Sequence, residues 1–85
     1  MIKIDFRQIG VKNIDGQTET ADVSKQLGNL MYMQGQNIEE CELGRAIYHK
    51  GSVELDSKQA DMVRRFIQPL SYVLRSAIEN TLLDD

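Results

Sequence analysis

The spacing of apolar residues along this chain changes from strand-like to helix-like, and this change restricts its fold class. Near the N-terminus, Ile2, Ile4 and Phe6 alternate with charged residues, which is the period of a strand with one buried face. From Val23 onward, apolar residues recur three and four positions apart, which is the period of a helix. The sequence therefore predicts a single small α+β domain over residues 1–85.

The strand pattern near the N-terminus predicts a β-hairpin. The two apolar residues that flank Gly10 lie in the opposite phase to the first three, and a bulge near residues 8–10 would restore one face. The pair Asp15-Gly16 is typical of a tight turn with positive φ. A weaker, polar strand follows over residues 18–21, so we predict a hairpin over about residues 2–21.

Two short helices are predicted next, over about residues 23–34 and 38–50. Their expected boundary residues are Asp22 and Gly35 for the first, and Asn37, Glu40 and Gly51 for the second. Gly28 and Gly44 lie inside these helices, which indicates close helix packing. A short third strand around Val53 and Leu55 is placed to join the hairpin.

The last segment has the clearest helical pattern. Asp56 and Gln59 have the spacing of a capping box. The apolar stripe that follows comprises Val63, Phe66, Ile67, Leu70, Val73, Leu74 and Ala77. Pro69 interrupts it at a cost of about 3 kcal/mol, yet the apolar phase does not change there. We predict one long C-terminal helix over about residues 57–82, kinked at Pro69, with a break at Gln68–Pro69 as second choice. The predicted order is ββααβα.

Catalytic and metal-binding side chains are scarce. The single Cys41 and the single His49 lie roughly 12 Å apart along one predicted helix, so they cannot form a dyad within it. No zinc-ligand spacing and no glycine-rich phosphate loop occurs, and Glu39, Glu40 and Glu42 are explained by the dipole of a helix N-terminus. We expect no enzymatic activity, no cofactor and no metal.

The cysteine content and the charge restrict the location and the partners. A lone cysteine fits a reducing compartment, no apolar run is long enough to span a membrane, and the N-terminus lacks the apolar core of a signal peptide. We therefore expect a cytoplasmic protein. The chain has 10 Lys+Arg against 13 Asp+Glu, a net charge of −3, which makes nucleic acid an unfavourable partner.

A small nucleic-acid-binding regulator is the alternative function. The helices at about 23–34 and 38–50 resemble a helix-turn-helix in outline. The front of the second helix carries three carboxylates, which would weaken binding to phosphates. This alternative would depend on Arg45, His49 and Lys50.

The C-terminal helix carries the candidate partner-binding residues. If this helix is continuous and Leu70 faces the protein core, Tyr72 lies on the outer face of the helix. Arg65 lies seven positions before Tyr72 on that face, and Arg75 lies three after it. Tyrosine and arginine are enriched at the energetic centres of protein interfaces. We predict that Tyr72, Arg65 and Arg75 contact another protein. The alternative is a tyrosine that lies flat over long side chains.

Three further large side chains fall outside the main helical stripes: Tyr32, Met33 and Tyr48. They either seal a wider core or form an apolar patch that a second copy covers. Because a chain of this size has a modest core, we expect self-association into a homo-oligomer.

The spacing of apolar residues and glycines in Asp22–Leu30, Glu42–Tyr48 and Val53–Leu55 resembles that of small uncharacterised proteins of bacterial prophages and mobile elements. The resemblance covers residues 18–67. It implies an accessory or assembly role and brings no catalytic residues with it. The sequence as a whole predicts a non-enzymatic protein–protein interaction module.

Overall fold

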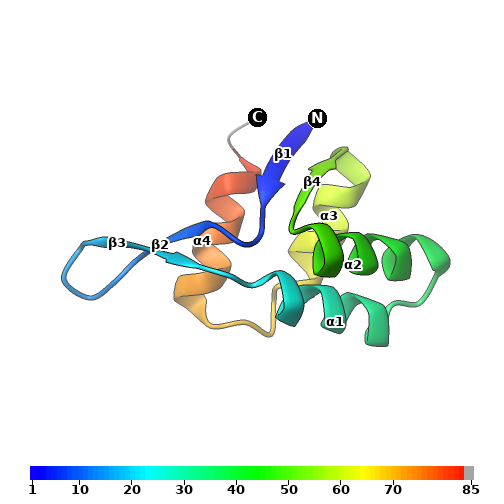
Figure 1. The fold of residues 1–85 in the computed structure, drawn as a ribbon, viewed down its shortest axis with the longest axis horizontal. Helices are drawn as coiled ribbons and strands as arrows, with labels where there is room; N and C mark the ends of the chain where they lie inside the picture. The colour runs from blue at the N-terminus through cyan, green and yellow to red at the C-terminus, as the bar shows by residue number, and fades with distance from the viewer. Residues whose placement is uncertain (84–85) are drawn as a thin grey trace.

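Residues 1–83 are described by the structure, a computed structural model, and they form an α+β fold. The elements are β1 (Ile2–Asp5), β2 (Ile9–Lys12), β3 (Thr18–Ala21), α1 (Ser24–Gln34), α2 (Ile38–Lys50), β4 (Ser52–Leu55), α3 (Ser57–Phe66) and α4 (Tyr72–Leu82). Two antiparallel two-stranded sheets form, β1 with β4 and β2 with β3. The β2–β3 hairpin projects from one end of the molecule, and α1 and α2 lie at the other (Figure 1).

The first predicted strand is divided into β1 and β2 by a turn, which corrects the predicted hairpin over residues 2–21. The backbone N–H of Gln8 donates to the carbonyl of Asp5 at 3.1 Å, and that of Arg7 donates to the Asp5 carboxylate at 3.0 Å. This turn, rather than a bulge, accounts for the change of apolar phase. The hairpin consists of β2 and β3 alone, and Gly16 adopts the expected positive φ of 83° in its turn.

Strand β4 pairs with β1 rather than with the hairpin. Ile2 lies opposite Leu55 and Ile4 opposite Val53. Ile4 and Leu55 are buried, because the face of the sheet that carries them packs on the core. The ladder continues beyond β1, where the N–H of Phe6 donates to the carbonyl of Gly51 at 2.9 Å.

Helices α1 and α2 form an antiparallel pair whose backbones touch. A Cβ atom built on Gly28 would lie 2.7 Å from the carbonyl oxygen of Gly44, and one on Gly44 would lie 2.7 Å from that of Gly28. Real Cβ atoms do not approach so closely, so both positions require glycine. The predicted close packing is confirmed.

The predicted helix boundaries are mostly confirmed. The side chain of Asn37 accepts from the N–H of Glu40, and that of Asp56 forms the complete capping box with Gln59. Gly51 ends α2 with a φ of 75°. At the start of α1, Asp22 lies one residue before the N-cap position and accepts hydrogen bonds from the N–H and the hydroxyl of Ser24.

The long C-terminal helix predicted over residues 57–82 is two helices, so the break kept as second choice is correct. Helix α3 ends at Phe66, and Leu70 donates its N–H to Ile67 in a turn at 3.0 Å. Pro69 has no N–H to continue a helix and disfavours helical backbone in the residue before it. Ser71 then caps α4. Among the stripe members beyond the break, Val73 is exposed, whereas Leu74 and Ala77 pack against the core.

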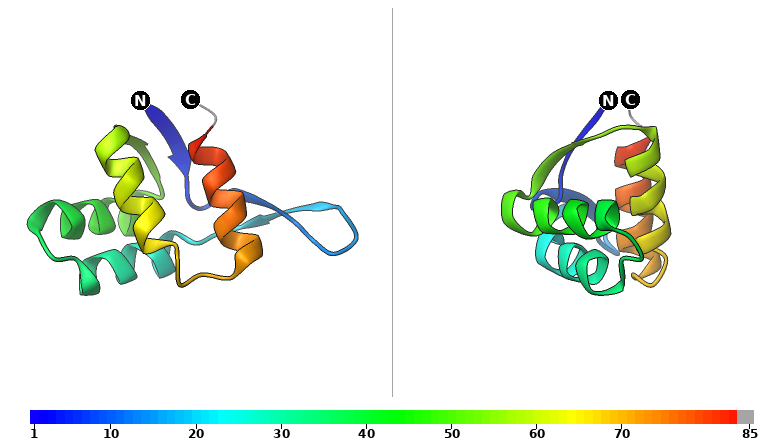
Figure 2. Two further views of the ribbon diagram at one scale, coloured as in Figure 1. Left: turned by 180° about the vertical axis from the view of Figure 1, so that it is seen from behind. Right: turned by 90° about the vertical axis from the view of Figure 1, so that its right-hand side faces the viewer.

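The core lies where the helices meet the strands. Helices α3 and α4 run in opposite directions on either side of the segment that joins them (Figure 2). The largest fully buried aliphatic and aromatic side chains are Ile4, Phe6, Ile9, Leu27, Met31, Ile47, Leu55, Val63, Ile67, Ile78 and Leu82. Strand β3 contributes no buried side chain. Within residues 1–83, no helix has the length and apolar character required to cross a membrane.

Candidate functional site

The first turn of α4 carries a tyrosine that is held in place on the surface. Tyr72 is 73% exposed, and the neighbouring Val73 is 51% exposed. The Arg75 guanidinium lies over the Tyr72 ring, with Cζ 5.8 Å from the ring centroid. Arg75 also donates to the carbonyl of Gln68 at 3.1 Å. Tyr72 and Arg75, which their helical spacing makes neighbours, are thus in contact.

A hollow of about 380 Å³ separates this turn from the hairpin. It is lined by Gly10, Lys12 and Thr18 of the hairpin and by Tyr72, Val73, Ser76, Ala77 and Asn80 of α4. None of these residues is acidic, although the chain has a net charge of −3. The nearby Glu19 lies opposite Val11 in the ladder, so its side chain is on the other face of the hairpin from that of Thr18. Lys12, Tyr72, Val73 and Arg75 are called the hairpin–α4 surface below.

Arg65 does not belong to the hairpin–α4 surface, which corrects the predicted three-residue patch. The prediction depended on one continuous helix, and the break at Pro69 places Arg65 on α3. Its guanidinium forms an ion pair with Glu40 of α2 and lies 5.4 Å from the Phe66 ring centroid. Arg65 therefore lines a different hollow from Tyr72.

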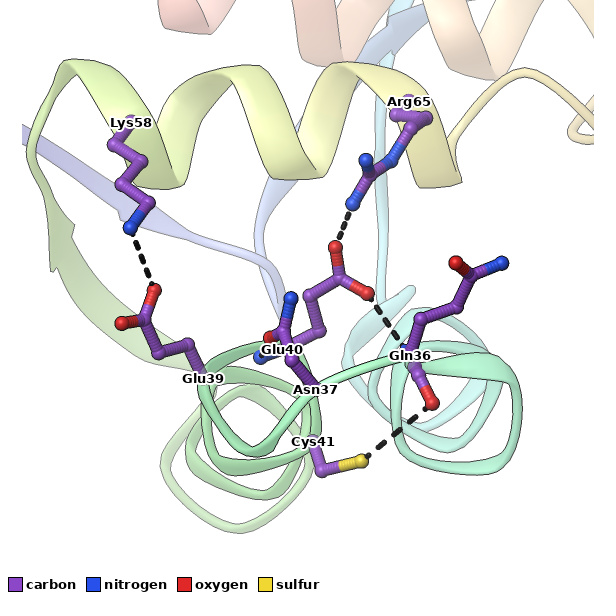
Figure 3. A network of polar contacts seen from close by, with 8 residues as sticks. Gln36, Asn37, Glu39, Glu40, Cys41, Lys58 and Arg65 are labelled. Atoms are coloured by element: carbon purple, nitrogen blue, oxygen red, sulfur yellow. Dashed lines mark hydrogen bonds and ion pairs between the residues drawn. The ribbon is translucent and has the colours of Figure 1, made fainter.

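Glu40 is the most buried carboxylate residue among residues 1–83, with 3% of its surface exposed. One oxygen accepts from the N–H of Gln36 at 2.9 Å, and the other pairs with Arg65 (Figure 3). The spacing of Asn37 and Glu40 is that of a capping box, in which this side chain would accept from the N–H of Asn37 instead. Glu40 thus joins the α1–α2 turn to α3, a role that local spacing did not indicate.

The other carboxylates of this turn also have cationic partners. Glu39 lies 2.9 Å from the ammonium of Lys58, and the hydrogen bond and charge of Glu39 raise the pKa of Lys58 above its ordinary value. Glu42 lies 4.0 Å from Arg45. Among the described residues, no three His, Cys, Asp or Glu side chains come together as metal donors.

Cys41 and His49 lie at opposite ends of α2. Cys41 is half-buried, with Sγ 3.5 Å from the carbonyl of Tyr32. His49 is exposed, and its ring packs edge-on against Tyr48 with centroids 5.2 Å apart. The two side chains share no site.

The outer face of the α1–α2 pair carries the residues considered for self-association. Tyr32, Met33 and Tyr48 are 50%, 71% and 37% exposed, so they do not seal the core. Tyr32 and Tyr48 flank a hollow of about 370 Å³ that Arg45 also lines. These side chains are available to a partner or to a second copy.

The α1–α2 pair differs from a helix-turn-helix in its geometry. The two helices run side by side in opposite directions (Figures 1 and 2), and their backbones touch at Gly28 and Gly44. In the DNA-binding motif, the helices instead cross at about 90–120°. Helix α2, which would enter the DNA groove in such a motif, has the acidic residues Glu39 and Glu40 in its first turn.

Comparison of the whole chain with protein families, with curated proteins and with solved structures finds no match.

Proposed function

We propose that this protein is a non-enzymatic interaction module that binds another protein through the hairpin–α4 surface. The observation that carries this proposal is the Tyr72 ring, which is exposed to solvent and contacts the guanidinium of Arg75. Arg75 is itself fixed by the Gln68 carbonyl, so little side-chain freedom remains to be lost on binding. Exposed tyrosine and arginine held in place are typical of the centres of protein interfaces.

The charge of the surface favours an acidic partner. Lys12 lines the hollow and Arg75 lies against the Tyr72 ring, so two cations are present, and no carboxylate lines the hollow. A partner that presents carboxylates beside an apolar side chain would complement these cations together with Tyr72 and Val73. The resemblance to prophage and mobile-element proteins adds the proposal that the module has an accessory role in such an element, in the cytoplasm. Self-association through Tyr32, Met33 and Tyr48 is a further proposal.

The alternative of a nucleic-acid-binding regulator has less support. The exposed Glu39 and Glu42 occupy the helix front that would face phosphates, and α1 and α2 run antiparallel. Duplex DNA binding that falls steeply with salt and is lost when Arg45 and Lys50 are replaced would favour the alternative.

The test compares two variants that remove the same residue types at the same helical spacing. Tyr72→Ala/Arg75→Ala alters the hairpin–α4 surface, and Tyr48→Ala/Arg45→Ala is the matched control on α2. A protein captured from an extract of the source cells is purified, and its affinity for each variant is measured by calorimetry. We expect the Tyr72/Arg75 variant to bind about 30-fold more weakly or worse, with its melting temperature changed by no more than about 3 °C.

The control decides between surfaces. If the Tyr48/Arg45 variant loses the partner and the Tyr72/Arg75 variant keeps it, the interface lies on the α1–α2 pair and the proposal is wrong. A drop of about 8 °C or more in the melting temperature of the Tyr72/Arg75 variant would show that these residues stabilise the fold instead.

A further inference from the structure

Strand β4 has one edge bonded to β1 and one open edge. Hydrogen-bonded and non-hydrogen-bonded pairs alternate along an antiparallel ladder. The bond from Phe6 to Gly51 makes that pair a hydrogen-bonded one, so the N–H and C=O groups of Ser52 and Glu54 point away from β1. Within residues 1–83, these backbone groups of Ser52 and Glu54 have no hydrogen-bond partner. The open edge therefore has donors and acceptors available for another strand.

A hollow of about 730 Å³ lies along this open edge. Helices α2 and α3 form its walls, residues 52–54 of β4 line it, and no residue of β1 does. Its apolar lining comprises Ile38, Leu43, Ala46, Val53 and Met62. Ligand sites in proteins commonly have volumes of about 300–1,000 Å³, so the hollow is large enough for a bound segment.

The charged residues that line the hollow are mostly acidic. They are Glu39, Glu42, Glu54 and Asp56 against Lys50 and Lys58, four carboxylates and two ammonium groups, for a formal charge of −2. The Glu39–Lys58 pair joins the two walls (Figure 3), and both side chains are more than half exposed. An exposed pair of this kind is weak, so it can open to admit a segment between the walls.

We propose that this hollow binds an extended peptide segment of a partner protein, which adds to β4 as a third strand and alternates apolar with basic side chains. The backbone of the segment forms hydrogen bonds with that of Ser52 and Glu54, and its apolar side chains contact Val53 and Met62. Its basic side chains pair with the carboxylates that line the hollow, which are called the acidic rim. A second copy is disfavoured as the occupant, because its own acidic rim would face this one. The site is distinct from the hairpin–α4 surface and does not depend on the function proposed for it.

The first experiment uses a synthetic peptide of seven residues that alternates valine with lysine, blocked at both ends. The matched control peptide alternates valine with glutamate. Hydrogen exchange of the backbone amides is followed by NMR during titration of each peptide. We expect saturation with the lysine peptide to slow exchange at Ser52 and Glu54 by about tenfold or more, because these amides gain hydrogen bonds. We expect no slowing with the glutamate peptide.

A pair of variants at one position separates the backbone bond from the charge. Glu54→Pro removes the N–H that points into the hollow, and proline is tolerated on an edge strand where that N–H bonds nothing. Glu54→Gln removes the carboxylate and keeps the N–H. We expect Glu54→Pro to bind the lysine peptide at least about fivefold more weakly than Glu54→Gln does. Unchanged exchange at the β1 amides verifies that the ladder is intact in both variants.

Four results would overturn the proposal. The lysine peptide fails to bind at millimolar concentration, or it binds and protects amides outside β4 only. Equal affinity of the two Glu54 variants would show that no strand is added. Slow exchange at Ser52 and Glu54 in the free protein that becomes slower with rising protein concentration would show that a second copy covers the edge instead.

Discussion

The two sheets of this protein differ in how far apart their strands lie in the sequence and in what they bury. Strands β2 and β3 are joined by one tight turn, whereas Ile2 of β1 pairs with Leu55 of β4. The local sheet projects from the molecule, and Ile9 is its one buried side chain. The long-range sheet contributes Ile4 and Leu55 to the core. In this chain, the pairing that is easiest to recognise contributes least to the core.

Each sheet also depends on one glycine with positive φ, and the two glycines differ in their surroundings. A Cβ atom added to Gly16, in the β2–β3 turn, would have no other atom within 4 Å. A Cβ atom added to Gly51, before β4, would lie 2.6 Å from the Arg7 side chain. Arg7 in turn donates to the carbonyl of His49 at 2.8 Å. A side chain at Gly16 would therefore have open space around it, whereas a side chain at Gly51 would collide with Arg7.

The largest expected effect is on the long-range sheet. Leu55→Ala should lower the free energy of unfolding by about 3 kcal/mol, because it leaves a cavity beneath β1 and β4. Thr20→Ala, on the exposed β3, should change it by no more than about 0.5 kcal/mol. Urea denaturation of both variants measures the difference. Similar losses for the two would mean that the hairpin stabilises the fold as much as the β1–β4 sheet does.

Substitution of the two glycines should give an intermediate effect. Gly16→Ala should cost about 1 kcal/mol for its left-handed backbone, and Gly51→Ala should cost more because Arg7 must also move. Denaturation of both variants, each repeated in an Arg7→Ala background, forms a double-mutant cycle. We expect Arg7→Ala to reduce the cost at Gly51 and leave that at Gly16 unchanged. An identical cost at Gly51 in both backgrounds would exclude the Arg7 contact as its cause.

The smallest effect should come from Asp22, which lies between the hairpin and α1. Hydrogen bonds from the hydroxyl and then the N–H of Ser24 lower the pKa of the Asp22 carboxyl below its ordinary value of 3.8. The ionised carboxylate therefore stabilises the fold above that ordinary value, and this stabilisation is lost as the pH falls through the lower pKa of the folded state. Asp22→Ala should be less stable than the parent protein at pH 6 and equal to it once the carboxyl is protonated in both the folded and the unfolded states.

The pH dependence is measured by denaturation between pH 6 and the acid limit of folding. Ser24→Ala serves as the control, since it removes the hydroxyl that contributes most to the lowered pKa. It should shift the loss of stability toward higher pH. A stability difference between Asp22→Ala and the parent that is the same at all pH values would contradict this assignment.

Features set by a few neighbouring residues could be predicted from the sequence. The caps at Asn37, Asp56 and Gly51 depend on local hydrogen bonds, and so does the turn at Gly16. The break at Pro69 was harder to predict, because two helices that pack on one core can have nearly the same apolar spacing as one bent helix. Ser71, with its capping bond to Leu74, was the missed signal.

The candidate site divides in the same way. Tyr72 and Arg75 lie on one turn of one helix, so their contact follows from their spacing of three positions. Arg65 meets Glu40, 25 positions earlier, and the open edge of β4 depends on its pairing with β1. Both contacts arise from tertiary packing that local patterns do not determine.

The contact between Gly28 and Gly44 bears on the order in which the chain folds. It joins positions 16 apart, whereas the pairing of Ile2 with Leu55 must close a loop of 53 positions at a greater cost in chain entropy. Once α1 and α2 have packed together, much of that loop is already ordered, so fewer flexible residues lose chain entropy when β1 pairs with β4. The helical hairpin is therefore suited to form early and to guide β1 and β4 to each other.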